Sequence, residues 1–353
     1  MAHDCDVIVV GAGIIGCAVA RELARAGMRP CILEAREAGA GATQASAGML
    51  VPYIEAPDDG GLHTLAVRSF QLYDEFISEL RSEGADVEYR RCGTLQVAAD
   101  GAAATALAAQ AAWIRSQGLE ARWLTRAEAA AIEPAARAPE GALLVPAHGY
   151  VRAGQLTSAL LESAKQHGAE FFPHQHVQQI THDGSRVSVT AGEMTYRAST
   201  IVIAAGSWSG LMINDGPAVS PVRGQLVRLR WHARPIERVL WSGHCYIVPW
   251  LDGTLLVGAT MEEVGFDERA TVDGVASLLD AARALLPDAA DATFVEARAG
   301  LRPSTPNGLP IIGRAPDHPS VIYATGHYRN GVLLAPITAK MVGELIQRFP
   351  DSR

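Results

Sequence analysis

The sequence predicts a mixed α/β fold in which a domain with a parallel sheet is interleaved with a domain built on an antiparallel sheet. An apolar run at residues 6–10 is followed by a glycine-rich turn, a helix-like segment and a second apolar run at 31–34. Such a strand–helix–strand order begins a parallel sheet. Strand-like runs separated by turn signals follow one another from residue 176 onward, which is typical of antiparallel pairing.

The chain is long enough for two domains. It has 353 residues, of which 48% are hydrophobic and 19% charged, so we expect a sizeable core and no disorder. The net charge of -8 gives no general attraction to nucleic acid or to an anionic membrane. No apolar run reaches transmembrane length without a charge or a turn residue, and the acidic start is unlike a signal peptide. We therefore expect a cytoplasmic protein with no nucleic-acid or membrane partner.

The cysteines indicate the same compartment. Their number is odd and they form no CxxC pair, which argues against a disulfide framework and against a zinc site, so we expect no metal. A reducing environment suits free thiols. The five are Cys5, Cys17, Cys31, Cys92 and Cys245.

The helices can be placed along the chain from their apolar periodicity and end signals. Thr125 and Glu128 form a capping-box pattern for a short helix that must end before Pro134. The last segment reads as strand, loop and helix, with the helix beginning near Asn330 and Gly331. The four longer helices expected before it span residues 14–26, 62–82, 101–118 and 153–167.

The first turn carries a dinucleotide-binding pattern. Gly11, Gly13 and Gly16 form GAGIIG between the first strand and its helix. Glycine allows the tight turn and the approach of backbone to a pyrophosphate, and the helix N-terminus offers free N–H groups to phosphates. Glu34 ends the second strand, where a carboxylate would bind a ribose hydroxyl and disfavour NADP. The unit predicts a Rossmann-like domain and leaves NAD and FAD both open.

The next segment, GAGATQASAGML at 39–50, is rich in small residues. It would let backbone pass close to a flat ligand, with Thr43 and Ser46 donating hydrogen bonds. A flexible loop is the alternative interpretation of the same composition. The position after the ribose-binding strand favours a cofactor longer than a mononucleotide.

A hairpin is predicted at Asp252-Gly253, a strong two-residue turn signal. Tyr246 would then share one face of the sheet with His244 and Met261, around a small residue. That face could line a small-ligand pocket. The alternative is a half-buried sheet with these side chains at its rim. The predicted register pairs Leu251 with Thr254, Trp250 with Leu255, Tyr246 with Ala259, and His244 with Met261.

Two arginines stand among glycines and apolar residues. Arg302 lies in GLRPSTPNGLPIIG and Arg329 in GHYRNGVLLAP, and no acidic residue lies near Arg329 in the chain. A guanidinium fork suits a carboxylate, so the two arginines and Tyr246 could fix one carboxylate together. Pairing of each arginine with a surface acid is the alternative. The helix N-terminus near Asn330 would stabilise negative charge, such as that of a reduced flavin.

Taken together, these segments resemble the FAD-dependent D-amino acid oxidase family, in particular its glycine oxidases of bacterial thiamine biosynthesis, over nearly the whole chain. The segments that carry the resemblance are GAGIIG, SAGML, HCYIVPW, VGATM, GLRPST and GHYRNGVLLAP. The resemblance implies a glutathione-reductase-like FAD fold with a discontinuous FAD-binding domain at 1–85, 143–220 and 296–353. It implies a substrate-binding domain with the antiparallel sheet at 86–142 and 221–295.

The resemblance also implies roles for individual residues. It places Arg302, Arg329 and Tyr246 on the substrate carboxylate. His244, Met49 and Met261 match residues near the reacting carbon, and Trp241 stands where the family has a tyrosine. The positions matching FAD contacts are Gly11, Gly13, Ile14, Ile15, Gly16, Glu34, Ala35, Ala42, Thr43, Ala47, Gly48, Met49, Val177, Gly206, His327, Tyr328, Arg329, Asn330, Gly331, Val332 and Leu333.

The implied activity is oxidative deamination of glycine and other small amines, such as sarcosine, D-alanine and D-proline. Hydride would pass from Cα to the flavin and molecular oxygen would be the acceptor, giving glyoxylate, ammonia and hydrogen peroxide. The imine would supply thiazole formation for thiamine. Relatives that attach flavin covalently use a cysteine in the C-terminal region, and none follows Cys245 here, so FAD is expected to be non-covalent. A homotetramer is expected.

Two alternatives stay open. One is a D-amino acid or sarcosine oxidase, or a dehydrogenase of the same family that passes electrons to another acceptor. The other is a dinucleotide-binding protein with no catalysis.

Overall fold

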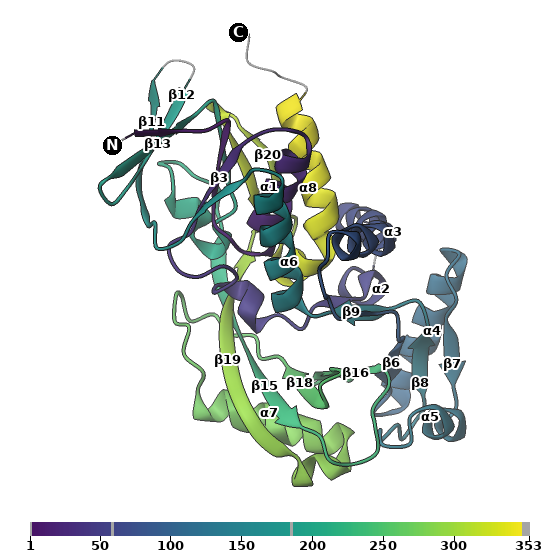
Figure 1. Ribbon diagram of the computed structural model, residues 1–353. Coiled ribbons are helices and arrows are strands. Elements are labelled where there is room, and N and C mark those ends of the chain that lie inside the picture. Colours follow the sequence, from purple (N-terminus) through teal and green to yellow (C-terminus); the bar gives the residue numbers. More distant parts are fainter. Residues whose placement is uncertain (1, 58–59, 184–185, 348–353) are drawn as a thin grey trace.

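The computed structural model describes residues 2–57, 60–183 and 186–347 (Figure 1). Its centre is a six-stranded sheet in the order β10-β3-β2-β14-β21-β20, in which only β20 and β21 pair antiparallel. The predicted strand–helix–strand start is confirmed, because helix α1 (Ile14–Arg25) joins β2 to β3. The six strands are β2 (Val7–Val10), β3 (Pro30–Leu33), β10 (Glu170–Phe172), β14 (Thr200–Ile203), β20 (Ile311–Ala315) and β21 (His318–Thr325).

This sheet is covered on both faces. Helices α1, α6 and α8 lie side by side, and α3 packs against α8 (Figure 1). A four-stranded sheet in the order β1-β13-β12-β11 packs Val187, Val189 and Tyr196 against Ile8 and Ile201. The covering elements are α3 (Gly61–Ser82), α6 (Ala153–Gln166), α8 (Gly331–Gln347), β1 (Ala2–Asp4), β11 (Val177–Asp183), β12 (Arg186–Ala191) and β13 (Met194–Ala198).

The second body of the molecule is an eight-stranded sheet in the order β19-β15-β18-β17-β16-β6-β8-β7, antiparallel as predicted except that β16 and β6 pair parallel. Helix α7 (Val272–Leu285) packs on it, and α4 (Gly101–Ser116) and α5 (Arg126–Ile132) lie near its β7 end (Figure 1). The predicted capping box of α5 is confirmed. The strands are β6 (Thr94–Val97), β7 (Arg122–Leu124), β8 (Ala142–Val145), β15 (Ser220–Arg230), β16 (Val239–Trp241), β17 (Tyr246–Pro249), β18 (Thr254–Gly258) and β19 (Thr293–Ser304).

Short elements connect the two bodies. A three-stranded sheet orders β4, β9 and β5. The C-terminal segment is strand, loop and helix as predicted, with a 3-10 turn before α8. The short elements are η1 (Ala42–Ala45), β4 (Met49–Leu50), α2 (Pro52–Glu55), β5 (Tyr89–Arg90), β9 (Gly149–Val151), η2 (Gly206–Leu211), η3 (Pro287–Asp291) and η4 (Tyr328–Asn330).

The hairpin between β17 and β18 exists, but its predicted register is wrong by one residue. Trp250 N donates to Thr254 O and Gly253 has a φ of 78°, so the loop holds three residues, with glycine in the left-handed position. The predicted pairs Leu251 with Thr254, Trp250 with Leu255, Tyr246 with Ala259 and His244 with Met261 are therefore not formed. Tyr246 instead pairs with Gly258 and Pro249 with Leu255, and His244 and Met261 lie beyond the ends of the two strands.

The proposed domain boundaries stay a prediction. All strands of the six-stranded and four-stranded sheets come from residues 1–85, 143–220 and 296–353, whereas β8, β15 and β19 of the large sheet run across predicted boundaries. Within the described ranges, none of the helices combines the length and the apolar character needed to cross a bilayer.

Candidate active site

A cavity of about 940 Å³ runs from the parallel sheet to the large antiparallel sheet. Part of its lining follows the carboxyl ends of four strands of the parallel sheet, namely Gly11, Glu34, Ala204 and His327. Ligands of open α/β sheets bind at this edge. The far end of the cavity is lined by residues of β17, β18 and β19, so one continuous space joins the two bodies.

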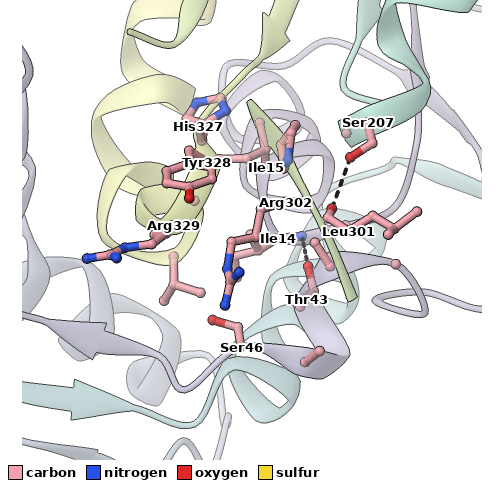
Figure 2. A pocket seen from close by; sticks show the side chains of 18 of the residues that line it. Ile14, Ile15, Thr43, Ser46, Ser207, Leu301, Arg302, His327, Tyr328 and Arg329 are labelled. Atoms are coloured by element: carbon pink, nitrogen blue, oxygen red, sulfur yellow. Dashed lines mark hydrogen bonds between the residues drawn. The ribbon is translucent and has the colours of Figure 1, made fainter. Parts of the chain in front are cut away.

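The nucleotide end is built on the start of α1. No side chain caps this helix at Gly13, and Ile14 N donates to Thr43 Oγ1 at 3.1 Å (Figure 2). Gly11 has a φ of 100°, and a Cβ there would lie 2.6 Å from Ala204 O. A side chain at this turn is therefore excluded, and the N-terminus of α1 stays open to an anion.

Glu34 is held in place beside this turn. Its Oε2 accepts from Ala12 N at 2.7 Å and its Oε1 accepts from Arg36 N at 2.9 Å. The side chain of Arg36 is bound elsewhere, to Glu268 at 2.9 Å. The carboxylate is thus fixed by backbone at the position expected for a ribose contact.

The segment from His327 to Gly331 closes the middle of the cavity. His327 is buried and forms a hydrogen bond with Thr338 Oγ1 at 2.9 Å, and burial lowers its pKa to about 3, so its ring is neutral. Tyr328 Oη donates to Met261 Sδ at 3.0 Å and so links this segment to the loop after β18. Asn330 is buried, and its Oδ1 has no hydrogen-bond partner among the described residues.

Arg302 on β19 enters the cavity with its charge uncompensated by an acid. Its Nη1 donates to Thr260 O at 3.0 Å and to Arg223 O at 3.4 Å, and none of the ion pairs in the described ranges includes it. A Cβ on Gly224 would lie 2.1 Å from Arg302 Nη2, so a glycine in β15 leaves the room for the guanidinium. Figure 2 shows Arg302 between Tyr328 and Ser46.

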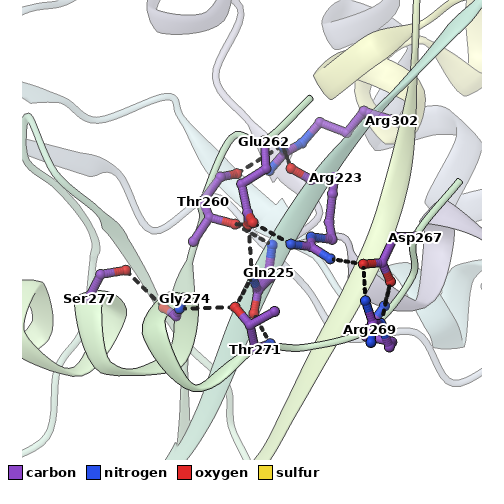
Figure 3. Close-up of polar contacts among 10 residues, drawn as sticks. All are labelled: Arg223, Gln225, Thr260, Glu262, Asp267, Arg269, Thr271, Gly274, Ser277 and Arg302. Carbon is purple, nitrogen blue, oxygen red and sulfur yellow. Dashed lines mark hydrogen bonds and ion pairs between the residues drawn. The ribbon is translucent and has the colours of Figure 1, made fainter. Parts of the chain in front are cut away.

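A polar network built around the buried side chains of Arg223 and Gln225 supports Arg302 (Figure 3). Arg223, which is 4% exposed, forms ion pairs with Glu262 and with Asp267, the latter at 2.9 Å. Gln225 Nε2 donates to Glu262 Oε1 at 2.8 Å, and Gln225 N donates to Thr260 Oγ1 at 2.9 Å. The network fixes the backbone on both sides of the Arg302 guanidinium, which places that group before any ligand arrives.

Tyr246 lies flat over Gly258 at the same end. A Cβ on Gly258 would be 2.3 Å from Tyr246 Oη, so only glycine leaves space for the ring. Desolvation by burial raises the pKa of Tyr246 to about 12, with smaller effects from Arg302 and Glu55. The hydroxyl is therefore a proton donor at neutral pH. Trp241 lies beside it, with ring centroids 5.5 Å apart, and also lines the cavity.

Arg329 has an acid partner that the local sequence does not reveal. Its Nε donates to Glu55 Oε2 at 2.7 Å and its Nη2 bonds the same oxygen. The Glu55 side chain is 8% exposed and that of Arg329 is 38% exposed. Burial raises the pKa of Glu55, and Arg329 and Arg302 oppose that rise. The two predicted arginines are therefore unlike, because Arg329 forms an ion pair with Glu55 whereas Arg302 forms none with the described residues.

Most of the predicted site residues come together here. Every predicted substrate residue lines the cavity, namely Arg302, Arg329, Tyr246, His244, Met261 and Met49. Of the predicted cofactor residues, only Gly16, Asn330 and Leu333 do not line it; Gly16 instead packs against Gly11, where a Cβ would lie 1.9 Å from Gly11 O. The sequence interpretation missed Glu55 and the Arg223 network, and neither has a local signal in the sequence.

Three comparisons with known proteins agree with this geometry. A family described as FAD dependent oxidoreductase matches residues 6–345. The glycine oxidase of Geobacillus kaustophilus is 36% identical over 355 aligned residues, which cover 99% of this chain and 94% of that protein, and a crystal structure of that enzyme matches with a TM-score of 0.94 at 35% identity, over 99% of this chain and 96% of that one. The bifunctional protein ThiO/ThiG of a Nostoc species is 34% identical over 97% of this chain, which spans 52% of that longer protein.

Proposed function

The chain belongs to the family of FAD-dependent oxidoreductases, and from this premise we propose that it is a flavin-dependent amine oxidase whose substrate is glycine. The observation that carries the proposal is the guanidinium of Arg302, which is held by backbone carbonyls, forms no ion pair within the described part of the chain, and lies at the same end of the cavity as Tyr246. These donors face the cavity that starts at the open end of α1. A small ligand with one carboxylate would satisfy them.

The residues present fit FAD. The N-terminus of α1, where Gly13, Ile14 and Ile15 line the cavity, suits a pyrophosphate, and Glu34 with Ala35 suits the ribose. The remaining contacts come from the linings already described. When bound, FAD accepts a hydride from the Cα of the amino acid and passes the electrons to molecular oxygen. The family's covalent attachment needs a later cysteine, and none follows Cys245, so we infer non-covalent binding.

The protein's own contribution is orientation. Arg302 and Tyr246 bind the substrate carboxylate, with Arg329 beside them, and this fixes where the neighbouring Cα–H bond points. Trp241 lines the same end of the cavity beside Tyr246, so its side chain would bear on which substrate side chains the site admits. The imine hydrolyses to glyoxylate and ammonia, or supplies thiazole formation for thiamine, a role supported by the fused relative. Sarcosine, D-alanine and D-proline are the competing substrates.

Anaerobic mixing of the yellow holoprotein with each candidate amine tests the proposal. We expect glycine to bleach the flavin absorbance, and air to restore it with one hydrogen peroxide per turnover. Stronger bleaching by D-proline or sarcosine would move the assignment to those substrates. A flavin that no amine reduces would contradict the proposed activity.

Two further expectations are part of the proposal. Five free thiols suit the cytoplasm, which we propose as the place of action. A homotetramer is proposed from the family resemblance. Sedimentation of the purified holoprotein measures the subunit number directly.

A further inference from the structure

We infer that Glu55 is the receptor for the substrate's amino group, which it binds and deprotonates; this assignment rests on the amine oxidation proposed above. Glu55 ends helix α2 and lines the same cavity as Arg302 and Tyr246. It would be a specificity-determining residue, because it distinguishes an amino acid from a simple carboxylic acid.

The geometry leaves one oxygen of the Glu55 carboxylate available to a ligand. Arg329 donates from both Nε and Nη2 to Oε2 alone. The other oxygen, Oε1, accepts no hydrogen bond within the described part of the chain and is not among the oxygens there that are sealed from solvent without a partner. Arg329 thus anchors the carboxylate by one oxygen and leaves the second facing the cavity.

The charges of the site match a zwitterion. Arg302 and Arg329 bring two positive charges and Glu55 one negative charge, and the neutral Tyr246 hydroxyl is the other titratable group whose pKa these three affect. Uncompensated charges are costly in an enclosed site. An amino acid brings a partner to each of two groups, because its carboxylate meets Arg302, which forms no ion pair among the described residues, and its ammonium meets the Glu55 oxygen that Arg329 does not bind. A ligand without the amine leaves the Glu55 oxygen facing an apolar group.

No other group lining the cavity suits this task as well. Glu34 is bound by two backbone N–H groups at the nucleotide end, and Glu268 is paired with Arg36 there. His327 is buried and its Nε2 is engaged by Thr338. His244 is exposed and lies beyond the end of β17. Glu55 is the carboxylate that lies at the Arg302 end.

The proton transfer balances simply. The ammonium N–H bond breaks, its proton joins Glu55 Oε1, and the electron pair stays on the amine nitrogen. That lone pair would then form the C=N bond as the hydride of the Cα–H bond passes to FAD, the two-electron oxidant of the proposed function. The proton on Glu55 leaves to solvent with the product, which restores the carboxylate for the next substrate.

The test compares glycine with acetate, which carries the same carboxylate without the amine. In the FAD-loaded Glu55→Gln variant, we expect glycine to bind more weakly and acetate to bind equally or more tightly, because Arg329 loses its partner. The ratio of the two dissociation constants should change roughly tenfold or more, the size of a hydrogen bond to a charged group. Glycine affinity comes from the concentration dependence of anaerobic flavin reduction, and acetate affinity from perturbation of the flavin absorbance.

The controls separate the possible outcomes. Glu83→Gln removes a carboxylate that is likewise paired with an arginine, Arg21, but neither residue lines the cavity, so the ratio should stay unchanged. If the Glu55→Gln variant does not hold FAD, the same two affinities are measured on the wild-type holoprotein at decreasing pH. Protonation of Glu55 should then weaken glycine binding while acetate binding does not fall in parallel. A ratio that neither the variant nor pH alters would overturn the assignment of Glu55. A wild type that glycine does not reduce would overturn the proposed function instead.

Discussion

Adding one methyl group at Gly258 should disable the substrate site without touching the cofactor site. The Cβ of an alanine there would lie 2.3 Å from Tyr246 Oη, 2.4 Å from its Cζ and 2.6 Å from its Cε2. Ordinary contacts are about 3.5–4.0 Å, so the ring must move by roughly 1 Å. Gly258→Ala therefore displaces the hydroxyl that donates to the substrate carboxylate.

The size of the effect follows from that displacement. A lost hydrogen bond to a charged group costs about 1.5–3 kcal/mol, which is roughly a tenfold to hundredfold weaker affinity for glycine. Overpacking should also lower the free energy of unfolding by about 1–3 kcal/mol. Gly313→Ala is the matched control, since Gly313 also lies in a strand, β20, and a Cβ there meets nothing within 4 Å.

The assay is anaerobic flavin reduction at increasing glycine concentration, with urea unfolding on the same samples. The effect on glycine affinity should vanish in a Tyr246→Phe background, because the hydroxyl is then already absent. Wild-type glycine affinity in a Gly258→Ala protein that holds FAD fully would refute the reasoning, as it would show that the ring is not confined by this glycine.

Four further predictions follow from the geometry. Arg302→Ala should weaken glycine binding by about 1.5–3 kcal/mol while FAD stays bound, as measured by flavin reduction and absorbance; unchanged affinity would remove Arg302 from the carboxylate site. His244→Ala should change the reduction rate only modestly, because the side chain orients and does not abstract a proton; complete loss of reduction in a folded variant would reverse this view. Thr43→Val removes the acceptor of Ile14 N and should weaken FAD binding severalfold in a fluorescence titration, whereas Thr43→Ser should not. Burial lowers the pKa of His148 and His327 from 6.5 to about 3 in the folded protein. Between these two pH values the unfolded chain binds more protons than the folded one, so the free energy of unfolding should fall as the pH drops below 6.5. Equal urea midpoints at about pH 7 and 5 would contradict this.

Local sequence patterns predicted much of the fold and part of the candidate site. The glycine turn and the place of Glu34 after β3 were readable because strand, helix and strand follow within one short stretch; the contact of Glu34 with a ribose stays a prediction. The C-terminal strand, loop and helix were readable for the same reason. Both features depend on neighbours in the chain.

The features that the sequence did not predict correctly are a contact between distant segments and a hairpin register. Glu55 and Arg329 are 274 residues apart, and no periodicity or spacing relates α2 to the segment before α8. The hairpin register failed because Asp252-Gly253 serves a three-residue loop as well as a two-residue one, with Gly253 in the left-handed position in the former. A change of one residue in the turn moves every later pair.

Because one cavity lies between the two sheets, the thermal stability of the protein should depend on whether FAD is bound as well as on the chain itself. One wall belongs to the parallel sheet and the opposite wall to the large antiparallel sheet, so a dinucleotide lying along it would act as a brace between them. Ligands that bind only the native state raise its stability with the logarithm of their free concentration. The melting temperature should accordingly climb with added FAD, and purification steps that strip the yellow colour should leave a protein that melts sooner.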